Sequence, residues 1–415
     1  MTTVQNSVPD EVRCDHLILL VGGNPLPNYV AARILGKQGG TVHLVHTQKT
    51  YRIAQRLAGQ LKRPPENSQL AGKFKITFVQ VSEDNPSDIF DKVKALAGQR
   101  DGRVGLNYTG GNRPMSVHAY SAVAAASRDP LFSYLDAGRL EMLVHDANRT
   151  LRRFRADLLL NMSLETLLRL QGLVNNNSNK DNNNDDDNNK LNKTGTTLLK
   201  PKLAAALAYL HSTDKGLSDW KNWRENGSDG WTKLPKNQPG LEKVEKVLEE
   251  LCNGDPTPDK VAQLLGHSEL RSTAKWWTSE WLENYTFDKL RSVIDGREDT
   301  QDAQMGLRCK RIDHGNRDFE LDIVVMRRYQ LFVFSCIVSN DAQACKRHLT
   351  EAYVRARQAG GDEARVGLVC VYKDPEALQE EIASDLDAAG KIRVFGQKDL
   401  RHLAARIKEW LDNQP

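Results

Sequence analysis

The chain has few cysteines and no long apolar run, and these absences exclude several classes of protein. Its 415 residues include six cysteines, none in a CxxC pair, so neither a disulfide framework nor a cysteine-based zinc site is indicated. No window approaches the apolar length that spans a bilayer, and the first nine residues lack the cationic and apolar segments of a signal peptide. We therefore expect a cytoplasmic protein with reduced thiols and no membrane partner.

A strong excess of one charge is missing as well. Lys and Arg number 58 against 54 Asp and Glu, so charge alone does not indicate a nucleic-acid binder. Hydrophobic residues make up 39% and charged residues 27%, a composition typical of a globular protein. The chain is too long for one ordinary core, so we expect two domains.

The first part of the chain alternates expected strands and helices. Strands are expected at 16–21, 41–46, 75–81 and 104–108, with helices between them and at 114–127. This alternation favours a parallel, doubly wound α/β sheet with helices on both faces. We assign residues 1–150 to this Rossmann-like domain.

A composition shift separates this part from the rest. Residues 175–189 are almost wholly Asn, Asp, Lys and Ser, which cannot bury enough apolar area to offset the entropy of ordering. We expect a helical connector at 151–270 with a disordered insert at 175–193. Residues 271–415 form the last domain, with a helix at 276–294 and strands at 305–312, 319–326 and 331–338.

Two glycine-containing breaks each follow an expected strand of the first domain and precede an expected helix. In an open parallel sheet the carboxyl ends of the strands form the binding crevice, and glycines there let the backbone approach a ligand. Neither break matches a dinucleotide fingerprint or a phosphate loop, and turns that simply need glycine are the plain alternative. The candidate ligand-binding residues are Gly22, Gly23, Asn24, Asn28, Asn107, Thr109, Gly110, Gly111, Asn112 and Arg113.

The second break resembles a known segment. Residues 107–115 resemble the Asn-x-Thr-Gly-Gly-Thr-Lys-x-Met segment of CARF domains, the CRISPR-associated sensors of cyclic oligoadenylates, and residues 20–28 look like their first-strand loop. Asn112-Arg113 replaces the commoner Thr-Lys, which keeps a positive donor of another shape. The resemblance implies a homodimer that binds a cyclic oligoadenylate, cyclic tetra-adenylate in the closest members, across its two-fold axis.

The last domain carries an acidic pair, Glu320 and Asp322, at the spacing that places both carboxylates on one face of a strand. Without further support these could be solvated charges paired with Arg327 or Arg328. Together with Glu283 and the following strand, they resemble the PD-(D/E)XK nuclease domain of CRISPR ancillary effectors. The resemblance implies a restriction-endonuclease-like α/β fold and a divalent metal, Mn²⁺ or Mg²⁺, on Glu283 and Asp322.

The second strand of this motif departs from the family. Ser335 and Ile337 stand where Glu and Lys are expected, and an alkyl chain neither polarises water nor binds phosphate. Glu351 could replace the missing carboxylate. Lys346, Arg347 or Lys310 could replace the missing cation. The candidate catalytic residues are Glu283, Asp322, Ser335 and Lys346.

Two classes of function follow from the resemblance. The first is a type III CRISPR ancillary effector that binds a cyclic oligoadenylate and then cleaves single-stranded DNA or RNA, or nicks duplex DNA. The alternative is a degenerate nuclease that acts as a messenger-binding sensor or regulator. A transcriptional regulator is a weaker third class, because no basic recognition helix stands out around residues 241–265.

Overall fold

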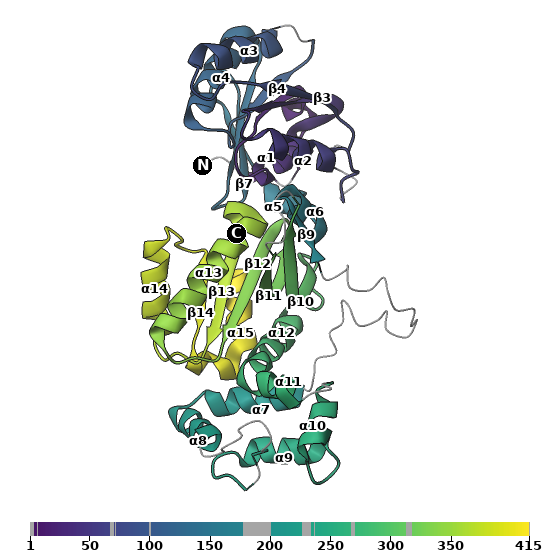
Figure 1. Cartoon of the computed structure of the whole chain (residues 1–415). Coiled ribbons are helices and arrows are strands. Elements are labelled where there is room, and N and C mark those ends of the chain that lie inside the picture. Colours follow the sequence, from purple (N-terminus) through teal and green to yellow (C-terminus); the bar gives the residue numbers. More distant parts are fainter. Residues whose placement is uncertain are drawn as a thin grey trace.

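A computed structural model describes the chain as two α/β domains and a helical group, arranged in a row (Figure 1). It describes residues 4–5, 7–66, 70, 72–98, 101–176, 201–225, 234–235, 237–266, 270–312 and 318–414. The first domain lies at one end of the molecule and helices α7–α10 at the other (Figure 1). Within the described residues, no helix combines the length and the apolar character that a bilayer crossing requires.

The first domain is built on a mixed sheet whose parallel centre confirms the predicted alternation. In spatial order its strands are β1 (Val4–Gln5), β8 (Leu151–Arg155), β7 (Glu141–His145), β6 (Leu131–Asp136), β5 (Val104–Asn107), β2 (Cys14–Leu20), β3 (Gly36–His46) and β4 (Lys75–Gln80). Strands β2 to β6 run parallel, whereas β7 is antiparallel to both β6 and β8. The carboxyl ends of β2 and β5 therefore leave the sheet side by side.

Helices cover both faces of this sheet. On one face α3 and α4 bury Ile18, Leu106 and Phe132, and on the other α1 and α2 bury Leu17 and Leu19. The helical segments are η1 (Asp10–Val12), α1 (Leu26–Leu35), α2 (Tyr51–Leu61), α3 (Pro86–Gly98), α4 (Arg113–Ala126), α5 (Ala156–Leu159) and α6 (Leu164–Leu170). α1 is buried along its whole length, with β2, β3 and β6 of the sheet and the helices α2 and α5 packed around it.

The second domain is a six-stranded sheet in the order β14, β13, β12, β11, β10, β9. The strands are β9 (Leu173–Asn175), β10 (Thr300–Arg311), β11 (Asp318–Arg327), β12 (Gln330–Ile337), β13 (Arg365–Cys370) and β14 (Ile392–Phe395). The helical segments are η4 (Trp276–Glu280), a π-helical turn, with α12 (Trp281–Ile294), α13 (Ala342–Gly360), η5 (Gly361–Glu363), α14 (Pro375–Asp385), η6 (Gln397–His402) and α15 (Leu403–Asp412). The core under α12 and α15 includes Phe332, Phe334 and Trp410, while α13 covers the opposite face.

A helical group packs beneath α12. Its helices are α7 (Pro201–His211), α8 (Asp214–Glu225), α9 (Glu242–Leu251), α10 (Pro258–Leu264) and α11 (Leu270–Lys275). The tryptophans Trp220, Trp276 and Trp281 are buried in one apolar cluster with α7 and α9. They serve as core anchors of this group rather than as exposed stacking surfaces.

Three short strands, β1, β8 and β9, lie outside the segments expected from the sequence. β8 completes the first sheet beyond residue 150, because it pairs with β7 and buries Phe154 among three arginines. β9 places Asn175 in the second sheet, opposite Cys309, so the ordered chain runs slightly into the range 175–193. The rest of that expected disordered insert lies outside the described residues.

Candidate functional site

The two glycine breaks lie against each other at the carboxyl edge of the first sheet. β2 and β5 are adjacent, with Leu19 opposite Asn107. A Cβ on Gly110 would lie 2.2 Å from the Leu20 carbonyl oxygen, and one on Gly22 would lie 2.8 Å from the Gly111 nitrogen. Only glycine fits at this distance, so the two loops pack backbone against backbone and form one surface.

The polar side chains of the second loop hold its shape. Asn107 is buried and donates to the Ser133 hydroxyl at 3.1 Å, while the Thr109 hydroxyl accepts the Leu135 N–H at 2.7 Å. Asn112 caps α4 by accepting the Met115 N–H at 2.9 Å. Gly23 and Arg113 are exposed, and they are the candidate ligand residues most open to solvent.

The two asparagines of the first loop have different surroundings. Asn28 is buried and donates to the Leu20 carbonyl at 2.8 Å, which fixes the end of β2. Asn24 faces the second domain: its Nδ2 donates to Glu363 at 3.3 Å, and its Oδ1 accepts Gln171 Nε2 at 3.0 Å. The Asn24 side chain therefore bridges the two domains.

Asp322 lies where β11 and β12 separate. The pairing of these strands ends at Ile323 and Phe334, so Asp322 is not part of the β11–β12 ladder. Its Oδ2 instead accepts the Ser335 hydroxyl at 3.0 Å and the Cys336 N–H at 2.8 Å. The carboxylate thus spans the opening between two strands, and Ser335 is its direct partner.

Glu283, in the first turn of α12, shares the electrostatic environment of Asp322. Burial, reinforced by the negative charges of Asp322 and Glu280, raises the pKa of Glu283 to about 8. Burial also raises the pKa of Asp322, although the bonds from Cys336 and Ser335 and the nearby His348 oppose the rise. The structure therefore brings together the two carboxylates that the sequence singled out.

A hollow of about 320 Å³ opens beside Asp322 and Ser335. Its other wall is one face of α13, which contributes His348, Glu351 and Arg355 at helical spacing. Glu351 is exposed and forms an ion pair with Arg355 at 3.7 Å. The hollow joins carboxylates to cationic groups, which is the environment that a phosphodiester and a metal ion require.

The carboxylates suit a hard divalent cation, which prefers oxygen ligands. In the part of the chain that the structure describes, no three His, Cys, Asp or Glu side chains are already gathered as a ligand set. The negative charge of Asp322 nevertheless disfavours the charged form of Glu283, and a cation between the two carboxylates would relieve that repulsion. Two carboxylates are enough to hold Mn²⁺ or Mg²⁺ when water and substrate oxygens complete the coordination.

The cations proposed from the sequence lie elsewhere. Lys346 forms an ion pair with Glu381 of α14, and Arg347 is exposed. Lys310 lies opposite Asp318 in the β10–β11 ladder. None of these three is among the residues lining the hollow, and the partly buried side chain of Ile337 packs against the core on the α13 side of the sheet.

Two other cationic groups are close to the carboxylates, and the sequence analysis did not identify them. Lys275 bonds to Glu280 at 2.7 Å across the π-helical turn, and its charge lowers the pKa of Glu283. His348 likewise lowers the pKa of Asp322. The helical spacing of His348, Glu351 and Arg355 could have indicated from the sequence that these three side chains share one face of a helix. The π-turn, which sets the position of Lys275, leaves no such periodic signature.

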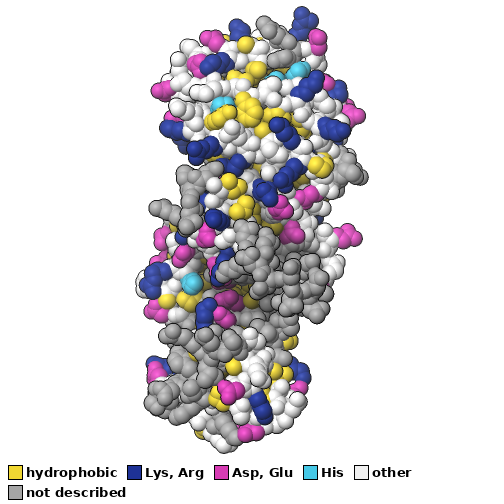
Figure 2. All heavy atoms as spheres, turned by 45° about the vertical axis from the view of Figure 1, so that its right-hand side comes forward, with side chains coloured by type: hydrophobic (Ala, Val, Ile, Leu, Met, Phe, Trp, Pro, Cys, Tyr) yellow, Lys and Arg dark blue, Asp and Glu magenta, His cyan; other side chains and the backbone are white. Residues whose placement is uncertain are grey.

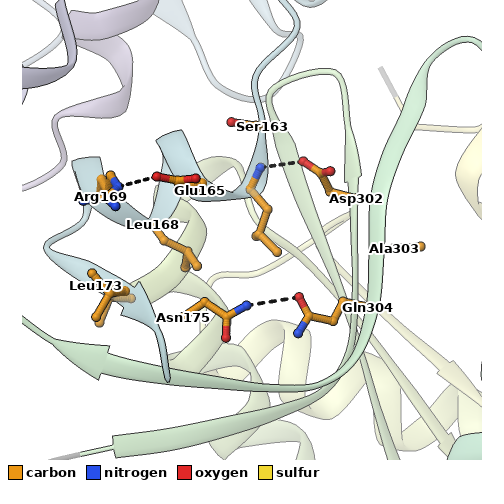
Figure 3. Close-up of a pocket in the computed structure, with 11 residues that line it drawn as sticks. Ser163, Glu165, Leu168, Arg169, Leu173, Asn175, Asp302, Ala303 and Gln304 are labelled. Atoms are coloured by element: carbon orange, nitrogen blue, oxygen red, sulfur yellow. Dashed lines mark hydrogen bonds and ion pairs between the residues drawn. The ribbon is translucent and has the colours of Figure 1, made fainter. Parts of the chain in front are cut away.

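A second cavity, of about 500 Å³, lies at the junction of the domains between α6, β9 and β10 (Figure 3). Its polar side chains are mutually engaged: Arg169 pairs with Glu165 at 2.7 Å, and Asn175 donates to Gln304 at 3.4 Å. Asp302 accepts the Leu164 N–H at 2.8 Å. The contacts of Asp302 and Gln304 tie α6 and β9 to β10, so the cavity is part of the junction between the domains.

On the described part of the face shown in Figure 2, basic and acidic side chains are interspersed. This agrees with the near balance of Lys and Arg over Asp and Glu in the sequence, 58 to 54. Recognition of a charged ligand therefore depends on local groups rather than on a field of one sign.

Comparisons with known proteins identify the fold. No family model matches the sequence, and no curated protein matches it. The structure resembles that of Can2 from Sulfobacillus thermosulfidooxidans in complex with cyclic tetra-adenylate, with a TM-score of 0.67, 14% identity, and coverage of 97% of this chain and 98% of that one. It also resembles protein VC1899 from Vibrio cholerae, with a TM-score of 0.63, 15% identity, and coverage of 96% and 98%. The chain thus shares the fold of the Can2 structure along nearly its whole length, and its two mixed sheets confirm the predicted α/β fold class.

Proposed function

We propose that the chain is a homodimeric type III CRISPR ancillary effector that binds a cyclic oligoadenylate in its first domain and cleaves nucleic acid in its second. The observation that carries the sensing part is the packing of the two glycine loops into one surface at the carboxyl edge of the sheet. The fold adds support, because the similar Can2 structure contains cyclic tetra-adenylate.

The loops offer what a cyclic oligoadenylate requires. The uncovered backbone at Gly23, with no atom within 4 Å of its Cβ position, leaves room for a ligand. Arg113 is exposed at the start of α4, where the helix N-terminus also favours phosphate. A cyclic oligoadenylate repeats the same phosphodiester around its ring. In a dimer with a two-fold axis, both chains would present the same loops to that ring, so each loop would be used twice.

The second domain contributes the groups for phosphodiester hydrolysis. Glu283 and Asp322 would hold Mn²⁺ or Mg²⁺, which lowers the pKa of a bound water and neutralises charge on the phosphate. Ser335 holds the Asp322 carboxylate in place through its hydroxyl. Lys275 supplies positive charge next to Glu283, and His348 lines the hollow beside Asp322. In the overall step water adds to phosphorus, the phosphorus–oxygen bond to the leaving nucleotide breaks, and the leaving oxygen takes up a proton.

One observation supports the alternative of a messenger-binding protein without cleavage activity. Ser335 and Ile337 occupy the positions where the motif has Glu and Lys, and the partly buried side chain of Ile337 packs against the core. A protein with these replacements and no substitute cation would retain the fold and the sensor loops but not the chemistry.

A cleavage assay separates the two functions. Single-stranded DNA, single-stranded RNA and supercoiled plasmid are incubated with the full chain and Mn²⁺, with and without cyclic tetra-adenylate, while binding of the messenger is measured separately. Binding together with messenger-dependent cleavage is the expected result. Binding without cleavage of any substrate would favour the sensor, and no binding would contradict both.

A further inference from the structure

A direct hydrogen bond joins the first glycine loop to the second domain. Asn24, which follows Gly22 and Gly23, donates from Nδ2 to Oε2 of Glu363 at 3.3 Å, although 339 positions separate the two residues. The same amide accepts from Gln171 and from the Leu26 N–H at 3.1 Å. The Asn24 side chain thus contacts its own loop, Gln171 after α6, and Glu363 in the second domain.

Glu363 is unusual for an acidic residue because it is fully buried. Among the described residues, its Oε1 has no hydrogen-bond partner, so Asn24 is the side chain that satisfies the carboxyl group. The Glu363 backbone is firmly held, because its carbonyl accepts Gln330 Nε2 at 2.9 Å and Arg365 Nη1 at 2.8 Å. A buried carboxyl with one side-chain partner is sensitive to the loss of that partner.

Glu363 also lies at the end of the helix that lines the candidate nuclease site. It closes η5, which begins at Gly361 directly after α13. Gly361 has a φ of 74°, and a Cβ there would lie 2.6 Å from Asn24 Nδ2, so the loop rests on the helix terminus itself. The same helix presents His348, Glu351 and Arg355 to the hollow beside Asp322.

We propose that the Asn24–Glu363 contact transmits occupancy of the messenger loop to α13 and thereby to the carboxylate site. This inference rests on the function proposed above and specifies how its two domains are coupled. The bond is long at 3.3 Å, near the limit of a hydrogen bond, so a small shift of the loop makes or breaks it. The Glu363 carbonyl holds η5 to β12 and β13, and η5 follows α13 directly. A shift of the Glu363 side chain is therefore expected to move the end of α13.

Hydrogen–deuterium exchange of the full chain tests the coupling without requiring cleavage. Exchange of α13 is measured with and without cyclic tetra-adenylate in the wild type, in Glu363→Met and in Glu363→Gln, and the Kd for the messenger is measured for each. Methionine matches the size of glutamate but has no oxygen acceptor for Asn24, whereas glutamine keeps one. We expect the messenger to change the exchange of α13 in the wild type and in Glu363→Gln, and this change to be lost in Glu363→Met with the Kd retained.

Gln301→Ala is the matched control, because Gln301 Nε2 donates to the Met162 carbonyl at 2.7 Å at the same domain junction but away from the loop. Its messenger response should equal that of the wild type. An α13 response that persists in Glu363→Met, or that is absent in the wild type although the messenger binds, would overturn the coupling. Failure of the wild type to bind the messenger would overturn the proposed function and the coupling with it, and the binding measurement identifies that case.

Discussion

Glu283 and Asp322 come from a helix and a strand that are distant in sequence, and the chemistry proposed for the second domain depends on their lying close together. Both side chains are partly buried, and the negative charge of Asp322 disfavours the charged form of Glu283. Buried carboxylates without a partner are costly, so proteins keep them together where a cation or a proton is used. The free-energy cost of burying Glu283 and Asp322 is consistent with residues retained for function rather than for stability.

Replacing either carboxylate tests this site. We expect Asp322→Asn to lower Mn²⁺-dependent cleavage by about 100-fold or more, because one metal ligand is lost. Asp295→Asn, an exposed carboxyl at the end of the same α12 helix, is the matched control and should leave cleavage unchanged. Initial rates on single-stranded substrate measure both. Equal activity of Asp322→Asn and the wild type would remove Asp322 from the chemistry.

The missing motif lysine leads to a second test. Lys275 is close enough to lower the pKa of Glu283, whereas Lys346 is engaged with Glu381. We expect Lys275→Met to reduce the cleavage rate by about tenfold, because positive charge near the developing phosphate charge is lost. Lys346→Met should change the rate little. The reverse order of the two effects would restore Lys346, the residue chosen from the sequence.

At the scale of elements, the glycine loops show how tight packing defines a surface. Gly110→Ala would force a methyl group to 2.2 Å from the Leu20 carbonyl oxygen. We expect a loss of about 1–3 kcal/mol in the free energy of unfolding and weaker messenger binding, since the loops must separate. Gly23→Ala, with no atom within 4 Å, should leave the stability unchanged. Thermal unfolding and titration of cyclic tetra-adenylate measure these effects, and equal stability of the two variants would contradict the backbone packing.

The elements also show which features the sequence could predict. The alternation of apolar strands and helices predicted that β2 to β6 run parallel, since each segment is long enough to show its hydrophobic periodicity. β8 and β9 were missed because one alternates apolar residues with arginines over five positions and the other has three residues. Glu283 and Asp322 were identified through a family resemblance, whereas their proximity depends on tertiary packing. The bridging position of Asn24 could not be predicted, because its partner lies 339 residues away.

At the scale of the whole molecule, the two domains share one continuous apolar cluster that runs from α1 and α6 to α13 and β12. Such an interface is more like a core than a transient contact, so the domains are expected to move as packed bodies. A buried polar group in this apolar interface is therefore expected to affect the stability of the molecule. Glu363 and Asp157 are the buried carboxyl groups at this junction.

Burial of Glu363 makes the stability of the molecule depend on pH. Burial and the neighbouring Asp362 raise the pKa of Glu363 to about 7, while Asn24 and Lys391 oppose the rise. The folded state therefore holds its proton more tightly than the unfolded state, so the free energy of unfolding is highest below pH 4.5 and falls as the pH rises through 7. The whole effect is about 3 kcal/mol, and Glu363→Gln should remove it. Urea unfolding at several pH values measures the slope, and identical slopes for both proteins would exclude Glu363 as the cause.

The most direct test of the link between sensing and cleavage is a titration of the cleavage rate against cyclic tetra-adenylate at fixed Mn²⁺, beside the binding isotherm of the same protein. If the glycine loops control the carboxylate site, the rate rises with occupancy and reaches half its maximum at half saturation, with one ring bound per two chains. A cleavage rate that stays constant while the messenger saturates the protein would contradict that control.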